Sequence, residues 1–172
     1  MQDLQGKAER VKPIDILQRL LDAYVEKAAL RNRHEAVARI VDQYDANNTY
    51  QYVIAREDQH LAWLADAVAS LGGTVPEQAP HEAVAAVKGE AEVRRIVGED
   101  AQALDAFVSA WRPRAAAVTN ARHRLMLELT LGEMQEHARL FHQASAGRLD
   151  LLGRRTGGAR TVGSVMPTRW VE

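Results

Sequence analysis

The sequence contains no cysteine among its 172 residues. This absence excludes disulfides, thiolate zinc sites, iron–sulfur clusters and cysteine nucleophiles in one step. Any metal ion that the protein binds must therefore be held by carboxylates and imidazoles.

Two further absences concern charge and long apolar runs. The chain has 22 basic and 23 acidic residues, so no net charge draws it to nucleic acid or to an anionic membrane. No run approaches the roughly 18 apolar residues of a membrane-spanning helix, and the polar start "MQDLQGKAERVKP" lacks the apolar core of a signal peptide. We expect a soluble, cytoplasmic protein that binds neither nucleic acid nor membranes.

Aromatic residues are also scarce, at 5% of the chain, whereas the hydrophobic content of 47% rests mainly on Ala, Leu and Val. This balance favours helices over strands. The length suits one domain with a proper core and is short for two. We therefore expect a single, nearly all-α domain.

Apolar residues recur at helical spacing in two segments of the first half. The first begins at Pro13, which suits the first position of a helix, and continues to Val41. The turn-forming stretch "DQYDANN", residues 42–48, separates it from the second helix, which Asp45 or Asn48 could cap. The second helix ends at "LGG", residues 71–73, and the two helices should be antiparallel.

The second half predicts a long connection and two more helices. Residues 74–82 hold two prolines and form the connection, and a third helix follows from about Pro80 to Trp111, broken near residues 97–100. Pro113 is expected to begin a fourth helix that ends near Gly147. The prediction is an antiparallel four-helix bundle, residues 1–146, with a long connection between its second and third helices and an irregular Gly/Arg-rich tail, residues 147–172.

Polar residues interrupt the apolar stripe of two of these helices. In "VIAREDQHLAWL", Glu57 and His60 lie three residues apart and therefore on the same side of the second helix. In "LGEMQEHARL", Glu133, Glu136 and His137 also face the centre of the apolar stripe of the fourth helix. Burying carboxylates there costs several kcal/mol unless a cation or a hydrogen-bond partner compensates them, and a metal ion is the first candidate.

These residues resemble the ferritin-like di-iron carboxylate superfamily, which includes ferritins, bacterioferritins and rubrerythrins, over residues 13–146. Sites of that family take a Glu from each of two helices and a Glu-x-x-His motif from each of the other two. Glu57 and His60 match this motif; Glu133 matches the second Glu, but Glu136 stands where His is expected and the imidazole of His137 comes one place later. The segment "EKAALRNR" is similar to the rubrerythrin-type run that follows a ligand Glu, which nominates Glu26.

Two ligand positions stay open. A turn centred near residue 42 would bring Glu26 level with Glu57, whereas a turn centred near residue 46 would bring His34 level instead. On the third helix, the position of the following turn favours Glu92, and the spacing of the family favours Glu99 or Asp100.

The resemblance implies a function. Two iron ions, or manganese or a mixed pair, would be bridged by carboxylates and capped by imidazoles, and would oxidise Fe(II) or reduce oxygen or peroxide. The alternative is a metal-free bundle of the same fold that acts as an interaction or stress-associated protein. The metal ligands implied are Glu26, Glu57, His60, Glu133, Glu136 and His137.

The tail suggests partners. "TVGSV", residues 161–165, resembles the Thr-Val-Gly-Ser-Leu type of targeting peptide that directs ferritin-like cargo into encapsulin shells, although the usual trailing basic pair is replaced by "MPTRWVE". The other interpretation is an arm that packs on its own bundle or on a second subunit through Val165, Met166 and Trp170. We expect a homo-oligomer, with a dimer as the simplest state.

Overall fold

The computed structural model describes residues 13–78, 83–148 and 151–152. Over these residues the chain is helical without a strand, so the predicted all-α fold is confirmed, and none of the helices is long and apolar enough to cross a membrane. The four helices are α1 (Pro13–Ala38), α2 (Tyr44–Ser70), α3 (Glu90–Ala116) and α4 (Ala121–Ser145).

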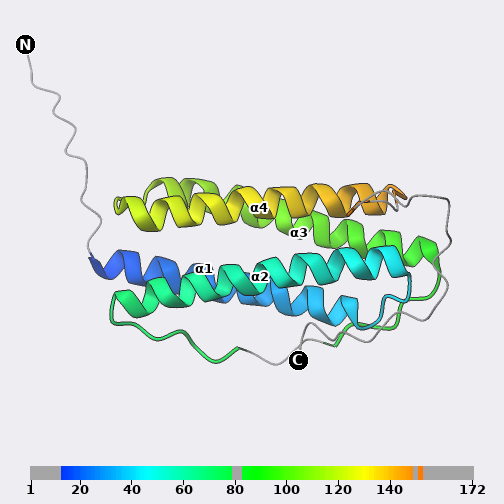
Figure 1. Ribbon diagram of the computed structural model, residues 1–172, viewed down its shortest axis with the longest axis horizontal. Coiled ribbons are helices and arrows are strands. Elements are labelled where there is room, and N and C mark those ends of the chain that lie inside the picture. The colour runs from blue at the N-terminus through cyan, green and yellow to red at the C-terminus, as the bar shows by residue number, and fades with distance from the viewer. Residues whose placement is uncertain (1–12, 79–82, 149–150, 153–172) are drawn as a thin grey trace, which may run out of the picture.

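The helices form two antiparallel hairpins packed into a bundle (Figure 1). The most extensive contacts join α1 to α2 and α3 to α4. Because α2 and α3 run in the same direction, the end of α2 and the start of α3 lie at opposite ends of the bundle (Figure 1). The predicted all-α four-helix bundle is therefore present in the described part of the chain.

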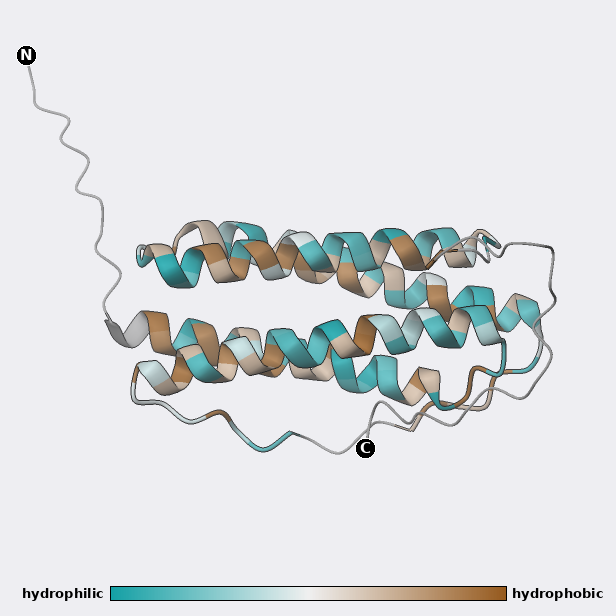
Figure 2. Cartoon of the chain, viewed as in Figure 1, coloured by the Kyte–Doolittle hydropathy of each residue, from teal (hydrophilic) through white to brown (hydrophobic). Residues whose placement is uncertain are grey.

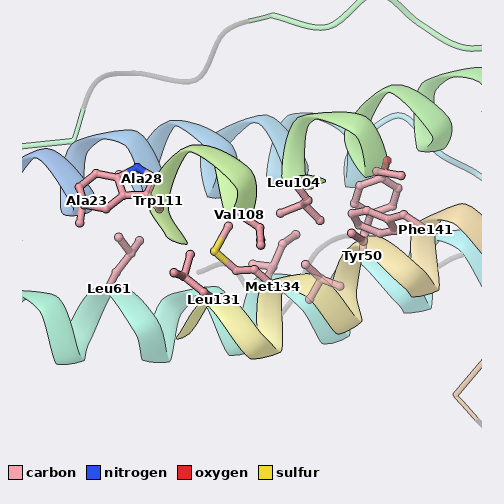
Figure 3. Packing of buried hydrophobic residues seen from close by; sticks show 14 of the residues in the cluster. Ala23, Ala28, Tyr50, Leu61, Leu104, Val108, Trp111, Leu131, Met134 and Phe141 are labelled. Carbon is pink, nitrogen blue, oxygen red and sulfur yellow. The ribbon is translucent and has the colours of Figure 1, made fainter. Parts of the chain in front are cut away.

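The core is built from the apolar stripes of all four helices, and hydrophobic and hydrophilic residues alternate round each helix (Figure 2). Met134 packs with Leu104 and Val108 at the α3–α4 contact (Figure 3). The rings of Tyr50 and Phe141 lie 4.7 Å apart toward one end of the bundle. Full burial of each such side chain contributes on the order of 1.5–3 kcal/mol, which holds the helices at fixed positions.

The first turn differs from its prediction. The first helix ends at Ala38 rather than at Val41, and α2 begins at Tyr44, so the prediction that Asp45 or Asn48 caps α2 is wrong. The reason is Asn47, whose buried amide donates to the carbonyls of Ala38 at 2.7 Å and of Val41 at 3.2 Å. These bonds fix a tighter turn than the polar composition of residues 42–48 suggested.

The third helix begins at Glu90 rather than near Pro80, and it is continuous through residues 97–100, where a break was expected. The neighbours Val97 and Ala101 are fully buried, and a Cβ on Gly98 would lie 3.6 Å from the Cβ of Ser145 on α4. Packing against α4 therefore outweighs the cost of about 1 kcal/mol that a glycine brings to a helix interior.

Pro113 does not begin the fourth helix, as predicted, but lies near the end of α3. The buried residues Trp111 and Ala115 continue the apolar face of α3 past the proline, and this packing explains why the helix does not stop there. The fourth helix begins instead at Ala121, where the side chain of Asn120 accepts a hydrogen bond from the backbone N–H of His123 at 3.1 Å.

Candidate metal centre

Glu57 is fully buried on α2 and is held by two side chains of α1. Lys27 donates from Nζ to Oε1 at 2.5 Å, and His34 donates from Nδ1 to Oε2 at 2.8 Å. Lys27 and His34 are also fully buried, and they lie seven residues, or about two helical turns, apart on the same face of α1. The long lysine side chain spans this distance, so both reach one carboxylate.

The charges of this group are balanced against one another inside the bundle. Burial alone would raise the pKa of the Glu57 carboxyl, but its electrostatic and hydrogen-bond interactions with His34 and Lys27 lower it well below its ordinary value. Burial lowers the pKa of the Lys27 ammonium, and Glu57 opposes that effect. Glu57 is therefore an ionised carboxylate that needs a cation beside it, and Lys27 supplies one.

A second carboxylate, Glu133 on α4, faces His60 on α2. The distance from Nε2 of the fully buried His60 to Oε2 of Glu133 is 2.9 Å. Arg56 donates from two nitrogens to the same carboxylate at 2.6–3.0 Å, and these bonds lower the pKa of Glu133. Glu133 is thus held ionised and oriented toward the buried side of the helix pair.

His137 completes the group one turn after Glu133. Its side chain is 2% exposed, and its ring stacks on that of His60 with centroids 6.1 Å apart. Burial lowers the pKa of His137 to about 4 and also lowers the pKa of His60. Both imidazoles are therefore neutral at pH 7, which is the form that ligates metal ions. The charges of Glu57, Lys27 and Glu133 all act on His137, so the six side chains form one unit, here called the Glu57–Glu133 cluster: Lys27, His34, Glu57, His60, Glu133 and His137.

The cluster contains polar atoms without partners. Nε2 of His34, Nδ1 of His60 and Nδ1 of His137 are buried and have no hydrogen-bond partner among the described residues. An unpaired buried polar group typically costs about 1–3 kcal/mol. These three nitrogens keep a lone pair or an N–H free for a bound group, and the described residues supply no partner for them.

Of the residues predicted from the sequence, Glu57, His60, Glu133 and His137 meet in the cluster. Glu26 does not: it is 44% exposed and accepts hydrogen bonds from Nε1 of Trp111 at 2.7 Å and from Arg114 at 3.0 Å. His34, the alternative on the same helix, contacts Glu57 instead. Glu136 is 61% exposed and pairs with its neighbour Arg139 at 2.7 Å.

The third helix adds no carboxylate to the cluster within the described part of the chain. Asp100 is buried, but it accepts hydrogen bonds from the hydroxyl of Tyr50 at 2.5 Å and from Arg33 at 3.0 Å. Glu92 and Glu99 are about half exposed and both pair with Arg95.

Sequence reasoning did not find Lys27. A signal existed, because Lys27 continues the spacing of the buried Leu20 and Ala23 and precedes the buried His34 by two turns. A lysine on such a stripe has to meet an acidic group inside the bundle, and Glu57 is that group.

The positive charges near the cluster bear on whether it would hold one divalent ion or two. Two carboxylates and neutral imidazoles can neutralise and coordinate a single iron or manganese ion. A pair of ions would bring at least four positive charges to a region that already holds Lys27 and Arg56. Among the described residues, no group of three or more carboxylate or imidazole side chains is arranged so that it could hold a metal ion.

Comparisons of the chain with models of protein families, with curated proteins and with solved structures find no match. What the protein does is therefore inferred from the chemistry of the Glu57–Glu133 cluster and from the bundle that holds it.

Proposed function

We propose that the protein is a ferritin-like bundle that binds iron or manganese at the Glu57–Glu133 cluster and acts as an oxidoreductase on oxygen, peroxide or Fe(II). The observation that carries this proposal is the set of unpaired, buried imidazole nitrogens on His34, His60 and His137 beside two ionised carboxylates. Mixed oxygen and nitrogen ligation without thiolate suits these two metals.

Glu57, His60, Glu133 and His137 would hold the ion, and His34 is the reserve ligand beside Glu57. A bound iron or manganese ion supplies a change of oxidation state and an open coordination position for oxygen or peroxide. The dinuclear centre implied by the family resemblance stays a prediction, and Glu26 and Glu136 would have to leave Arg114 and Arg139 to take part in it.

The protein side chains prepare the cluster for this exchange. Lys27 neutralises Glu57 through their ion pair, and burial lowers the pKa of the Lys27 ammonium. Arg56 holds Glu133 in one orientation through its paired hydrogen bonds.

Metal content tests the proposal directly. The protein would be produced in iron-supplemented medium and analysed for metals, beside the variants Glu57→Gln and Glu133→Gln and the controls Glu26→Gln and Glu136→Gln. We expect about one iron or manganese per chain, lost in the first two variants and kept in the controls. About two ions per chain, lost also in Glu26→Gln, would support the dinuclear centre instead. No metal, and no uptake from anaerobic Fe(II) or Mn(II), would refute metal-dependent activity.

A metal-free bundle that acts as an interaction or stress-associated protein is the second candidate. The ion pair between Lys27 and Glu57 favours it, because that pair already neutralises the buried carboxylate without a metal. Metal analysis separates the two functions, since the second predicts that no variant of the cluster changes metal content.

The proposed partners depend on the tail. The peptide over residues 161–165 and the anchors Val165, Met166 and Trp170 lie outside the described residues. We propose from the resemblance that the peptide directs the protein into an encapsulin shell, and that the protein is a dimer. Co-expression with a shell protein tests the first point: a chain truncated after residue 152 should no longer be enclosed, and equal loading would exclude targeting by the tail.

A further inference from the structure

A groove of about 650 Å³ lies on the outside of the bundle, next to the Glu57–Glu133 cluster. It is lined mainly by α4, with Tyr52 from α2 and with Leu151 and Leu152 from the segment after α4. Its volume falls in the range of about 300–1,000 Å³ that is typical of small-molecule sites. Glu133 and His137 belong both to the groove and to the cluster.

The walls of the groove expose large apolar side chains. Tyr52 is 45% exposed, Leu129 is 53% exposed and Leu152 is 42% exposed. These residues come from three segments of the chain and line one cavity. Apolar side chains that gather at one exposed place commonly mark a binding surface, since scattered ones need no explanation.

Gly132 keeps one side of the groove open. It lies in the interior of α4, where glycine is less favourable than alanine, and a Cβ built on it would meet no atom within 4 Å. Neither packing nor backbone conformation therefore requires a glycine here, because its φ is not in the left-handed region. The space left free is part of the groove.

The inner end of the groove is an imidazole without a full set of partners. His137 lines the groove although its side chain is only 2% exposed, and its Nδ1 has no hydrogen-bond partner among the described residues. The edge of its ring meets Tyr52, with centroids 6.1 Å apart at an interplanar angle of 84°. A bound molecule would thus contact Tyr52 and approach His137.

The carboxylates at the rim of the groove favour a ligand that carries a positive charge. Among the described residues, three carboxylates, Glu128, Glu133 and Glu136, line the groove with one cation, Arg139, which pairs with Glu136 at 2.7 Å. Glu133 is satisfied by Arg56, but Glu128 is half exposed and its ion pair with Arg124 is long, at 3.9 Å. A cationic group therefore has a carboxylate available at the rim.

We propose that this groove is the binding site of a small organic amine with an apolar body. The apolar part lies over Gly132 against Tyr52, Leu129 and Leu152, and the ammonium group pairs with Glu128. The amine site goes beyond the proposed metal chemistry. The groove and the Glu57–Glu133 cluster have only Glu133 and His137 in common, so an experiment can refute amine binding without refuting metal binding, and the reverse.

Titration of metal-free protein with hexylamine, followed by NMR of the leucine methyl groups, tests the site. We expect shifts at Leu129 and Leu152, about tenfold weaker binding of hexanol, and weaker binding still of hexanoate, which Glu128 repels. Equal binding of all three molecules, or shifts outside the groove alone, would overturn the proposal.

Matched variants sharpen the test. Gly132→Trp should fill the groove and abolish hexylamine binding, whereas Gly132→Ala should raise the Tm and leave most binding intact. Leu129→Ala should weaken binding several-fold. Leu125→Ala, at a somewhat more exposed leucine of α4 outside the groove, should not. If Gly132→Trp instead changes the oligomeric state in sedimentation and hexylamine does not bind, the groove is an interface with a second copy and the proposal is wrong.

Discussion

At the scale of single residues, the sequence predicts the inner carboxylates and imidazoles well but not their partners. Glu57, His60, Glu133 and His137 share the face of apolar neighbours one turn away, so helical periodicity alone places them inside. Glu26 and Lys27 are adjacent and about 100° apart on the helix, and only Lys27 has the phase of the buried stripe. The resemblance nominated Glu26, whereas packing turned it toward Trp111.

The buried ion pair gives a prediction for Lys27. Lys27→Met leaves Glu57 buried without its cation, which should destabilise metal-free protein by about 3–5 kcal/mol in urea unfolding. Saturating Mn(II) should restore much of this loss, because the ion replaces the missing charge. The exposed Lys88→Met is the control and should leave stability within about 0.5 kcal/mol of the original. An unchanged stability in Lys27→Met would mean that the pair does not hold the cluster together.

At the scale of helices, the sequence predicts that each of the four helices exists, but it does not predict the residues at which they begin and end. Gly98 and Pro113 are local breaking signals, yet both lie inside α3 because flanking residues are buried against other helices. The start of α2 likewise depends on Asn47, which bonds backward to α1. Such bonds join segments that periodicity treats separately, so a single sequence does not reveal them.

The start of α4 gives a prediction about capping. Asn120→Ala removes the acceptor of the backbone N–H of His123 and should cost about 1 kcal/mol in urea unfolding. Asn48, exposed inside α2, is the matched control: Asn48→Ala should be neutral or slightly stabilising, because alanine favours helix interiors. Equal losses in both variants would argue that the Asn120 cap contributes nothing specific.

The same helix end predicts a dependence on pH. Burial, with a smaller effect of Arg122, lowers the pKa of His123 below its ordinary value of 6.5. The unfolded chain therefore binds this proton more readily, so the stability that neutral His123 contributes is complete above about pH 6.5 and is lost as the pH falls below it.

Unfolding curves measured between pH 7.5 and 5 check this dependence. In His123→Gln the loss of stability over this range should be smaller than in the original protein. His142, exposed in the last turn of α4, is the control. His142→Gln should leave the loss of stability between pH 7.5 and 5 as large as in the original protein. A steeper loss in His123→Gln would reverse the assigned sign.

At the scale of the whole molecule, the prolines and the length of the segment between the second and third helices predict the crossover. The crossover sets α2 beside α4, which brings the motif of Glu57 and His60 to that of Glu133 and His137. These two motifs belong to different hairpins, and contacts between the hairpins are fewer than those within them. A bound ion would therefore join the two hairpins across a contact that is less extensive than the contacts within each hairpin.

This arrangement predicts that metal binding stabilises the fold globally. An ion that binds only the folded state at about 100 times its Kd adds about 2.7 kcal/mol, which for a chain of this size raises the Tm by roughly 5–10 °C. Anaerobic Fe(II) or Mn(II) should produce this shift in calorimetry as a single transition, since both hairpins are tied together. Glu133→Gln should abolish the shift, and Glu136→Gln, a surface glutamate of the same helix, should keep it. A shift of equal size in both variants would place the ion outside the cluster, and two separate transitions would show that the ion holds one hairpin alone.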